Sequence, residues 1–318
     1  MTRAFRPRAF AALAFVALLL AGAAPAAPIK VIIDTDVAMG YPGHDVDDGL
    51  VLLLALNSPE IEIVGVTAAW GNYTQQKTFA KARELLAAAG RSDIPCLAGA
   101  RGPGDRGRPT PASLFIANAV TSRPGEIVIL AIGTLTNLAT AIGSDPEVAP
   151  AMQRIVSMGG TLAPPGRWPL GAMLDLNYGA DVASAKLVMQ SGVAFTCIHS
   201  ALCRQTVIGP DRYRRLCETA PFQRELIARE TGGWFRLNLI VNPQPGTPGM
   251  VPWDVSALAF LIHPEFFTDN WMRAEIDDRG FGCKTVVARE EGLAAGTGIN
   301  APSRVDADRF WAWFFERI

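Results

Sequence analysis

Five aspartates lie within fifteen residues near the start of the chain, and their type and spacing could do chemistry. They form two groups, Asp34-Thr35-Asp36 and Asp45-Val46-Asp47-Asp48. Left unpaired, so many carboxylates would repel one another, and helix capping accounts for only one or two of them. A hard divalent cation explains the whole set better, because Ca²⁺ binds several carboxylate and carbonyl oxygens at once. The cluster therefore predicts a site for a hard divalent cation such as Ca²⁺.

The small number of histidines also favours carboxylate chemistry. The chain has only His44, His199 and His263, which is too few for a polyhistidine zinc site. A strand that ends in Asp-x-Asp also occurs in haloacid-dehalogenase-type phosphatases, which need a downstream lysine and a second acidic motif. None of the five lysines is obviously placed for that role, and no convincing second acidic motif follows. A phosphatase is therefore the weaker hypothesis.

Alternating strands and helices must position these aspartates. Lys30–Asp34 is typical of a buried parallel strand, and Asp48–Leu56 predicts a helix whose acidic start suits the helix dipole. Further strands are predicted at Ile61–Trp70, Ile94–Ala98, Ile127–Ile132, Ile155–Met158 and Phe195–Ile198, and helices at Gln75–Ala89, Leu114–Val120, Leu135–Ile142 and Val182–Gln190. This order predicts an α/β fold with a mostly parallel central sheet flanked by helices, and ligands collect at the carboxyl ends of such strands.

The second half of the chain departs from this alternation. Asp211–Asn238 looks helical without strands, which predicts a helical flank. A Pro/Gly-rich loop at Asn242–Pro252, a helix from Asp254, two late strands and a helix at Asp306–Glu316 follow. No linker or internal repeat divides the chain, so we expect residues 27–318 to form a single domain.

The first 26 residues predict a secretory signal peptide. Three arginines precede the apolar run Ala11–Leu20, and Ala24-Pro25-Ala26 offers small residues for cleavage. Removing three of the 29 basic residues leaves 26 against 30 acidic ones, a net charge of −4. We therefore expect a periplasmic or secreted protein that, after cleavage, has no membrane-spanning segment. The lack of a basic excess argues against nucleic acid as a partner.

Export makes the five cysteines relevant, because disulfides persist outside the cytoplasm. The odd number leaves at least one thiol unpaired within a monomer. Cys197 and Cys203 are close enough in sequence for a disulfide, and buried free thiols are the alternative.

The order of these motifs resembles the nucleoside hydrolases, and in particular the inosine-uridine preferring ones. Their signature is a strand that ends in Asp-x-Asp, a Pro-Gly turn and a paired Asp that opens a helix. Here it reads Val31–Asp36, Pro42-Gly43 and Asp47-Asp48. Further matches follow in order at Thr67–Asn72, Ile132–Asn137, Met158–Gly160, Asp175–Asn177, Asp181 and Trp253-Asp254. The resemblance spans nearly the whole chain after the signal peptide.

This resemblance implies a Ca²⁺-dependent hydrolysis of the N-glycosidic bond of ribonucleosides. It assigns the calcium to Asp36, Asp48, the backbone carbonyl of Ile132 and Asp254. Asp36 would also act as general base for the metal-bound water that attacks the anomeric carbon. Calcium would lower the pKa of that water, and the carboxylates would stabilise positive charge on the sugar.

The resemblance also implies how a small-molecule nucleoside substrate is held. Asp47, Asn72 and Asn177 would bind the ribose, Asp175 would lie near its 5′ end and Met158 would pack on the sugar. Related enzymes are commonly dimers or tetramers, so we expect a homo-oligomer.

Two departures from the family pattern are visible in the sequence. Ten residues, Val37–Val46, separate the Asp-x-Asp motif from the paired Asp47-Asp48, where the family has a tight turn. Trp253 stands where the family often has a histidine that assists the leaving base; a tryptophan can stack on a base but cannot donate a proton to it as an acid. The leaving-group acid is therefore unassigned, with His44, Trp168, Trp234 and Arg236 as candidates.

An exported calcium-dependent ribose- or nucleoside-binding protein without catalysis is the alternative. The base preference stays open.

Overall fold

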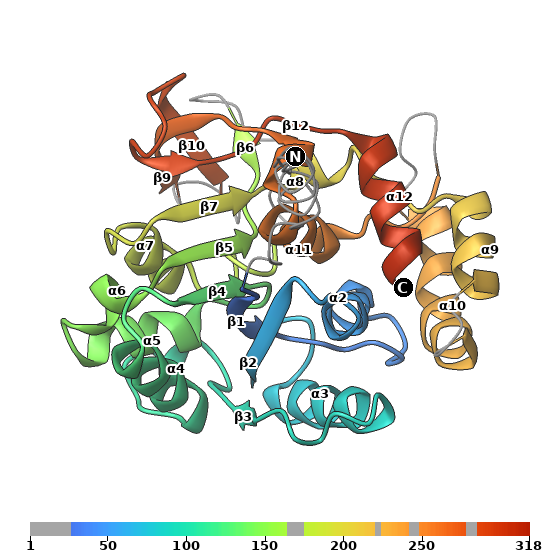
Figure 1. Cartoon of the computed structure of the whole chain (residues 1–318), viewed down its shortest axis with the longest axis horizontal. Coiled ribbons are helices and arrows are strands. Elements are labelled where there is room, and N and C mark those ends of the chain that lie inside the picture. Colours follow the sequence, from blue (N-terminus) through green and yellow to red (C-terminus); the bar gives the residue numbers. More distant parts are fainter. Residues whose placement is uncertain (1–26, 164–174, 220–223, 242–247, 278–284) are drawn as a thin grey trace, which may run out of the picture.

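A large, mostly parallel β-sheet with helices on both faces forms the centre of the molecule (Figure 1). The computed structural model describes residues 27–163, 175–219, 224–241, 248–277 and 285–318. The expected signal peptide, Met1–Ala26, lies outside these ranges, as do Trp168 and Cys283. The α/β fold that the sequence predicts is confirmed.

The sheet has a parallel core and an outer part that mixes parallel and antiparallel pairs. The parallel strands are β1 (Ile29–Thr35), β2 (Ile61–Ala68), β3 (Cys96–Ala98), β4 (Ile127–Ala131), β5 (Arg154–Met158) and β7 (Phe195–Ile198). Across the described residues the order is β3-β2-β1-β4-β5-β7-β11-β9-β10-β6, which adds β6 (Leu162–Ala163), β9 (Trp271–Asp277), β10 (Thr285–Glu291) and β11 (Ile299–Asn300). A separate pair joins β8 (Phe267–Thr268) to β12 (Arg304–Val305).

The register of the central strands brings their carboxyl ends to one edge. Asp34 of β1 pairs with Thr67 of β2 on one side and with Ala131 of β4 on the other. Ala131 in turn pairs with Ser157 of β5. The residues that follow these strands therefore lie side by side, as the rule for ligand sites in parallel sheets requires.

Helices cover both faces of the sheet. The α-helices of the described residues are α2 (Asp47–Leu56), α3 (Gln75–Ala88), α4 (Pro111–Ser122), α5 (Thr136–Ser144), α6 (Val148–Ala151), α7 (Val182–Met189), α8 (Ser200–Cys203), α9 (Pro210–Thr219), α10 (Arg224–Val241), α11 (Trp253–Ile262) and α12 (Ala307–Arg317). Val31 and Ile33 of β1 pack toward α2 and α11, whereas Ile32 packs with α4, α5 and α7, because successive strand residues face opposite ways. α9 and α10 pack together as the expected helical flank (Figure 1).

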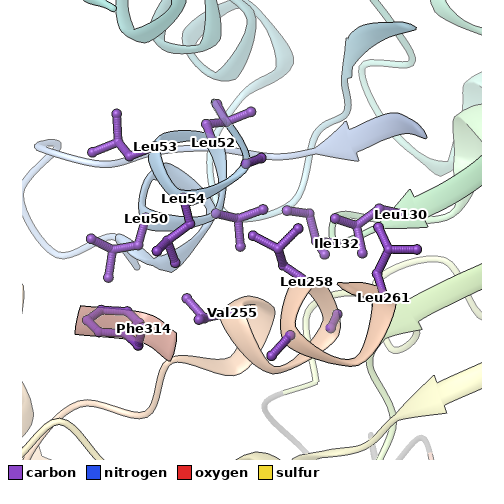
Figure 2. Packing of buried hydrophobic residues seen from close by; sticks show 14 of the residues in the cluster. Leu50, Leu52, Leu53, Leu54, Leu130, Ile132, Val255, Leu258, Leu261 and Phe314 are labelled. Carbon is purple, nitrogen blue, oxygen red and sulfur yellow. The ribbon is translucent and has the colours of Figure 1, made fainter. Parts of the chain in front are cut away.

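The helices α2 and α11 pack against each other in the larger core. Leu50 and Leu54, one helical turn apart, point from α2 toward Val255 and Leu258 of α11 (Figure 2). Leu52 lies on the opposite side of α2, so this helix is buried on two faces, which explains its almost continuous apolar sequence. The core thus holds together two helices that are far apart in the chain.

Several local expectations are refined by the structure. Strand β2 ends at Ala68 rather than Trp70, and β3 begins at Cys96 rather than Ile94. Cys197 and Cys203 are buried free thiols, so the disulfide between them is not formed. Within the described ranges, no helix combines the length and apolar character needed to cross a membrane.

Candidate active site

A cavity of about 480 Å³ opens at the carboxyl ends of the central strands. Its lining contains all ten residues that the sequence assigned to metal, substrate or catalysis. They are Asp36, Asp47, Asp48, Asn72, Ile132, Met158, Asp175, Asn177, Trp253 and Asp254. The sequence-based selection of site residues therefore converges on one place in the fold.

Three buried aspartates gather where two helices begin. Asp47 and Asp48 open α2 and Asp254 lies in the first turn of α11, and their carboxylate oxygens lie within 4.8 Å of one another. The backbone N–H of Asp254 donates to Asp47 Oδ2 at 2.9 Å. Helix N-termini favour negative charge, which helps to hold these carboxylates together. The sequence assigned Asp47 to the ribose, and the geometry adds it to the candidate metal ligands.

Asp36 lies directly beside this group. Its backbone N–H donates to Asp48 Oδ1 at 3.2 Å, and the Thr35 hydroxyl donates to the same oxygen. The Asp36 side chain is only 2% exposed, and its Oδ2 accepts a hydrogen bond from the backbone N–H of Asn72 at 2.7 Å. The end of β1 therefore ties the fourth carboxylate to the other three.

Burial and mutual repulsion raise the pKa values of these carboxyl groups. Burial, and after it the charge of Asp47, raises the pKa of Asp48 to about 7. Burial and the charge of Asp48 raise the pKa of Asp36 well above its usual range, and Asp254 responds in the same way to burial and to Asp47. In the part of the chain that the structure describes, no basic side chain forms an ion pair with these four groups.

Such a donor set fits a divalent metal ion. Buried charges require a partner, and several carboxylate oxygens within a few ångströms of one another are the ligands that hard cations prefer. The cluster can therefore hold a metal, with Ile132 lining the same cavity as a source of a carbonyl oxygen.

Asn72 holds the long acidic loop in place. Its side-chain Oδ1 accepts from the backbone N–H of Asp45 at 3.1 Å, and its Nδ2 donates to the Asp45 carbonyl at 3.0 Å. His44 Nδ1 donates to the Asn72 carbonyl at 2.5 Å. These bonds seat His44 and Asp45 in the cavity wall, so the longer Val37–Val46 loop does reach the site.

Asp175 and Asn177 organise the opposite wall. The Asp175 carboxylate accepts backbone hydrogen bonds from Gly160 at 2.9 Å and from Asn177 and Tyr178 at 3.1 Å each, and burial raises its pKa to about 6. Asn177 Nδ2 donates to the carbonyls of Ile132 at 3.0 Å and Met158 at 3.1 Å. Asn177 is therefore in contact with the backbone oxygen that the sequence assigned to the metal.

Asp34, by contrast, lies outside the cavity lining and supports the strand ends around it. Its Oδ1 accepts from the Thr67 hydroxyl at 2.6 Å and from Asn137 Nδ2 at 2.9 Å. Asn137 Oδ1 in turn accepts from the backbone N–H of Ala100 at 2.7 Å. Asp34 thus connects the end of β1 to β2 and α5 and does not line the cavity.

The sequence did not single out Arg204, which also lines the cavity. Its guanidinium lies over the Trp253 ring, 4.9 Å from the ring centroid. Trp234, a candidate for the leaving-group acid, lines the cavity too, whereas Arg236 does not. Arg204 follows β7 by six residues, so a position after a strand end was its only signal in the sequence.

The sequence and the fold are similar to those of several known proteins. A family model described as inosine-uridine preferring nucleoside hydrolase matches residues 31–312. The chain is 28% identical to the pyrimidine-specific ribonucleoside hydrolase RihA of Citrobacter koseri, over 88% of this chain and 94% of that protein. It is 26% identical to a probable uridine nucleosidase 1 of Oryza sativa subsp. japonica, over 83% and 86%. Its fold is similar to that of a purine-preferring ribonucleoside hydrolase from Gardnerella vaginalis, with a TM-score of 0.76, 22% identity and 91% and 97% coverage.

Proposed function

Because the chain belongs to the inosine-uridine preferring nucleoside hydrolase family, we propose that its cavity hydrolyses the N-glycosidic bond of ribonucleosides with Ca²⁺ as cofactor. The observation that carries the proposal is the buried cluster of Asp47, Asp48 and Asp254 beside Asp36, without a basic partner among the described residues. Because the family consists of hydrolases, we favour catalysis over the alternative of a nucleoside-binding protein, which rested on Trp253 in place of the usual histidine. The products are the free base and ribose.

The calcium ligands would come from both helix starts and from the end of β4. Asp36, Asp48, Asp254 and the carbonyl of Ile132 would hold the ion, and Asp47 is close enough to take part. When bound, Ca²⁺ supplies a Lewis acid that lowers the pKa of water and orients the ribose hydroxyls. Its charge would also compensate the repulsion that raises the carboxyl pKa values.

Asp36 is the proposed general base. The backbone N–H of Asn72 fixes one of its oxygens, so the carboxylate has a defined orientation. It would accept the proton of a water that attacks the anomeric carbon. The neighbouring carboxylates would stabilise the positive charge that develops on the sugar as the bond to the base breaks.

The remaining residues would position the nucleoside. Asp47 and Asn177 would bind ribose hydroxyls, Asp175 would lie near the 5′ end and Met158 would pack on the sugar. Asn72 keeps the role of a ribose ligand in this proposal and adds the loop contacts described above. Trp253 would stack on the base.

The test is release of reducing sugar from nucleosides by the purified protein. Asp36→Asn should lower kcat by about 10²- to 10⁴-fold, because it removes the general base and one metal ligand. Asp93→Asn is the matched control, since Asp93 pairs with Arg91 on the exposed surface. Chelation should abolish activity and added Ca²⁺ should restore it; unchanged turnover by Asp36→Asn would refute the mechanism.

Export and assembly are further parts of the proposal. We expect cleavage near Ala26 and a periplasmic or secreted product, because of the charged and apolar segments at the N-terminus. Mass spectrometry of the mature protein tests the cleavage site. The resemblance to oligomeric enzymes leads us to expect a homo-oligomer, which light scattering would measure.

A further inference from the structure

We propose that Arg204, which lies over the Trp253 ring, stabilises the leaving base as an anion and so takes the place of a proton donor. Uridine, whose base carries a carbonyl next to the glycosidic nitrogen, is the substrate on which this role can be tested. This inference rests on the proposed function and deepens it by naming a catalytic residue.

Arg204 and Trp253 form one structural unit in the cavity wall. Arg204 directly follows α8, and Trp253 is the first residue of α11. The Cys203 thiol donates to the Trp253 carbonyl at 3.4 Å, which joins the two segments. The next residue after Trp253 is Asp254 of the acidic cluster, so the pair of Arg204 and Trp253 lies beside the proposed metal site.

The cavity lining has a polar part and an aromatic part, which suit different parts of the substrate. The aspartates and Asn177 suit the ribose, which is rich in hydroxyl groups. Trp234, Trp253 and Arg204 supply flat, polarisable surface, which suits a planar heterocycle. A base that follows the ribose into the cavity would thus meet the guanidinium.

Neither member of the pair can act as an acid. Tryptophan has only an indole N–H, and arginine stays protonated in proteins. Burial lowers the pKa of Arg204 from its ordinary value, which marks its charge as partly removed from water. A fixed charge in such surroundings stabilises a developing opposite charge more strongly than it would in water.

The bond changes need no further reactant. The bond between the anomeric carbon and N1 of uracil breaks, and its electron pair stays on N1 and spreads onto the O2 carbonyl. The guanidinium donates hydrogen bonds to that anionic base. A water oxygen bonds to the anomeric carbon, Asp36 accepts the water proton, and that proton returns through solvent to the released base. Adenine has no such carbonyl and gains most from protonation of a ring nitrogen, which this pair does not provide.

The experiment compares uridine with 4-nitrophenyl riboside, whose nitrophenolate leaves without help. Arg204→Gln should lower kcat for uridine by about 100-fold, with a smaller change in KM. The same variant should lose at most a few-fold on the nitrophenyl substrate. Arg204→Lys should recover part of the uridine rate, because it keeps the charge but not the planar fork. The wild type should cleave uridine faster than adenosine.

Arg212→Gln is the matched control. Arg212 also lies over a tryptophan, 4.5 Å from the Trp311 ring centroid, but it does not line the cavity. It should leave both rates unchanged. Equal losses of kcat on both substrates in Arg204→Gln, or no loss on either, would overturn the inference. It would also be overturned if His44→Asn, and not Arg204→Gln, lost kcat on uridine alone. A wild type that cleaves neither substrate would overturn the proposed function itself, and this inference with it.

Discussion

Two aspartates at the end of β1 show how neighbours decide the role of a residue. Asp34 and Asp36 are both buried and lie two positions apart. Asp34 contacts the neutral donors Thr67 and Asn137, whereas Asp36 lies against the carboxylate of Asp48. Strand β1 ends at Thr35, so Asp36 leaves the strand geometry and turns into the cavity. Asp34 therefore supports the sheet, and Asp36 belongs to the acidic cluster.

The acidic cluster should make the metal-free protein less stable as the pH rises. Burial raises the pKa of Asp48 from 3.8 to about 7, so the folded state holds that proton more tightly than the unfolded chain does. This contribution is fully present below about pH 4 and is lost as the pH approaches 7. Calcium binds the ionised carboxylates, so it should cancel the loss.

We therefore expect the difference in Tm between calcium-saturated and chelated protein to grow from pH 5 to pH 8, because the pKa of Asp48, about 7, lies within this range. Asp34→Asn is the control, because burial also raises the pKa of Asp34 to about 6, yet this group lies outside the proposed metal site. It should leave the calcium-dependent part intact. A Tm difference that does not vary with pH would contradict the assignment.

At the scale of elements, the turn after β2 sets the position of Asp36. Gly71 has a φ of +145°, and a Cβ there would lie 2.1 Å from Asp36 Oδ2. The following residue, Asn72, holds the same oxygen by its backbone N–H. The turn can approach the carboxylate so closely only because position 71 has no side chain.

Gly71→Ala should lower kcat by about 100-fold, because a displaced catalytic group loses its alignment with the substrate. Gly90→Ala is the matched control. Gly90 also has a positive φ, of +70°, but a Cβ there would meet nothing within 4 Å. It should reduce stability through backbone strain and leave kcat unchanged. Steady-state kinetics and urea unfolding of both variants measure this; equal kinetic effects would show that strain alone acts.

At the scale of the whole molecule, the core between α2 and α11 assembles the site. These helices carry Asp47, Asp48 and Asp254, and Leu54 is fully buried between them (Figure 2). Leu54→Ala should lower the free energy of unfolding by about 2–5 kcal/mol through a cavity. Leu114→Ala, at a side chain that is 49% exposed, should cost less than about 0.5 kcal/mol. Urea denaturation would check both values, and equal losses would show that this packing carries no special weight.

Much of the fold followed from local patterns. The buried parallel strands read as short β-branched runs, and α2 was marked by its acidic start and apolar length, because both signals depend on neighbours in the chain. The ends of β2 and β3 differed by two residues, since pairing with other strands decides where a strand stops. The short β6 and α8 carried no periodic signal to detect.

The sequence alone was enough to select ten residues that line one cavity, because carboxylates at strand ends and helix starts have few other uses, and the order of the motifs matched a family. Only the tertiary structure separated Asp34 from the other four aspartates of that segment and added Asp47 to the candidate metal ligands, beside Asp48 and Asp254. It also placed Arg204 over Trp253 and showed that Asn72 anchors the acidic loop. Those roles arise from contacts between segments distant in the chain, where packing, and not local propensity, decides which groups meet.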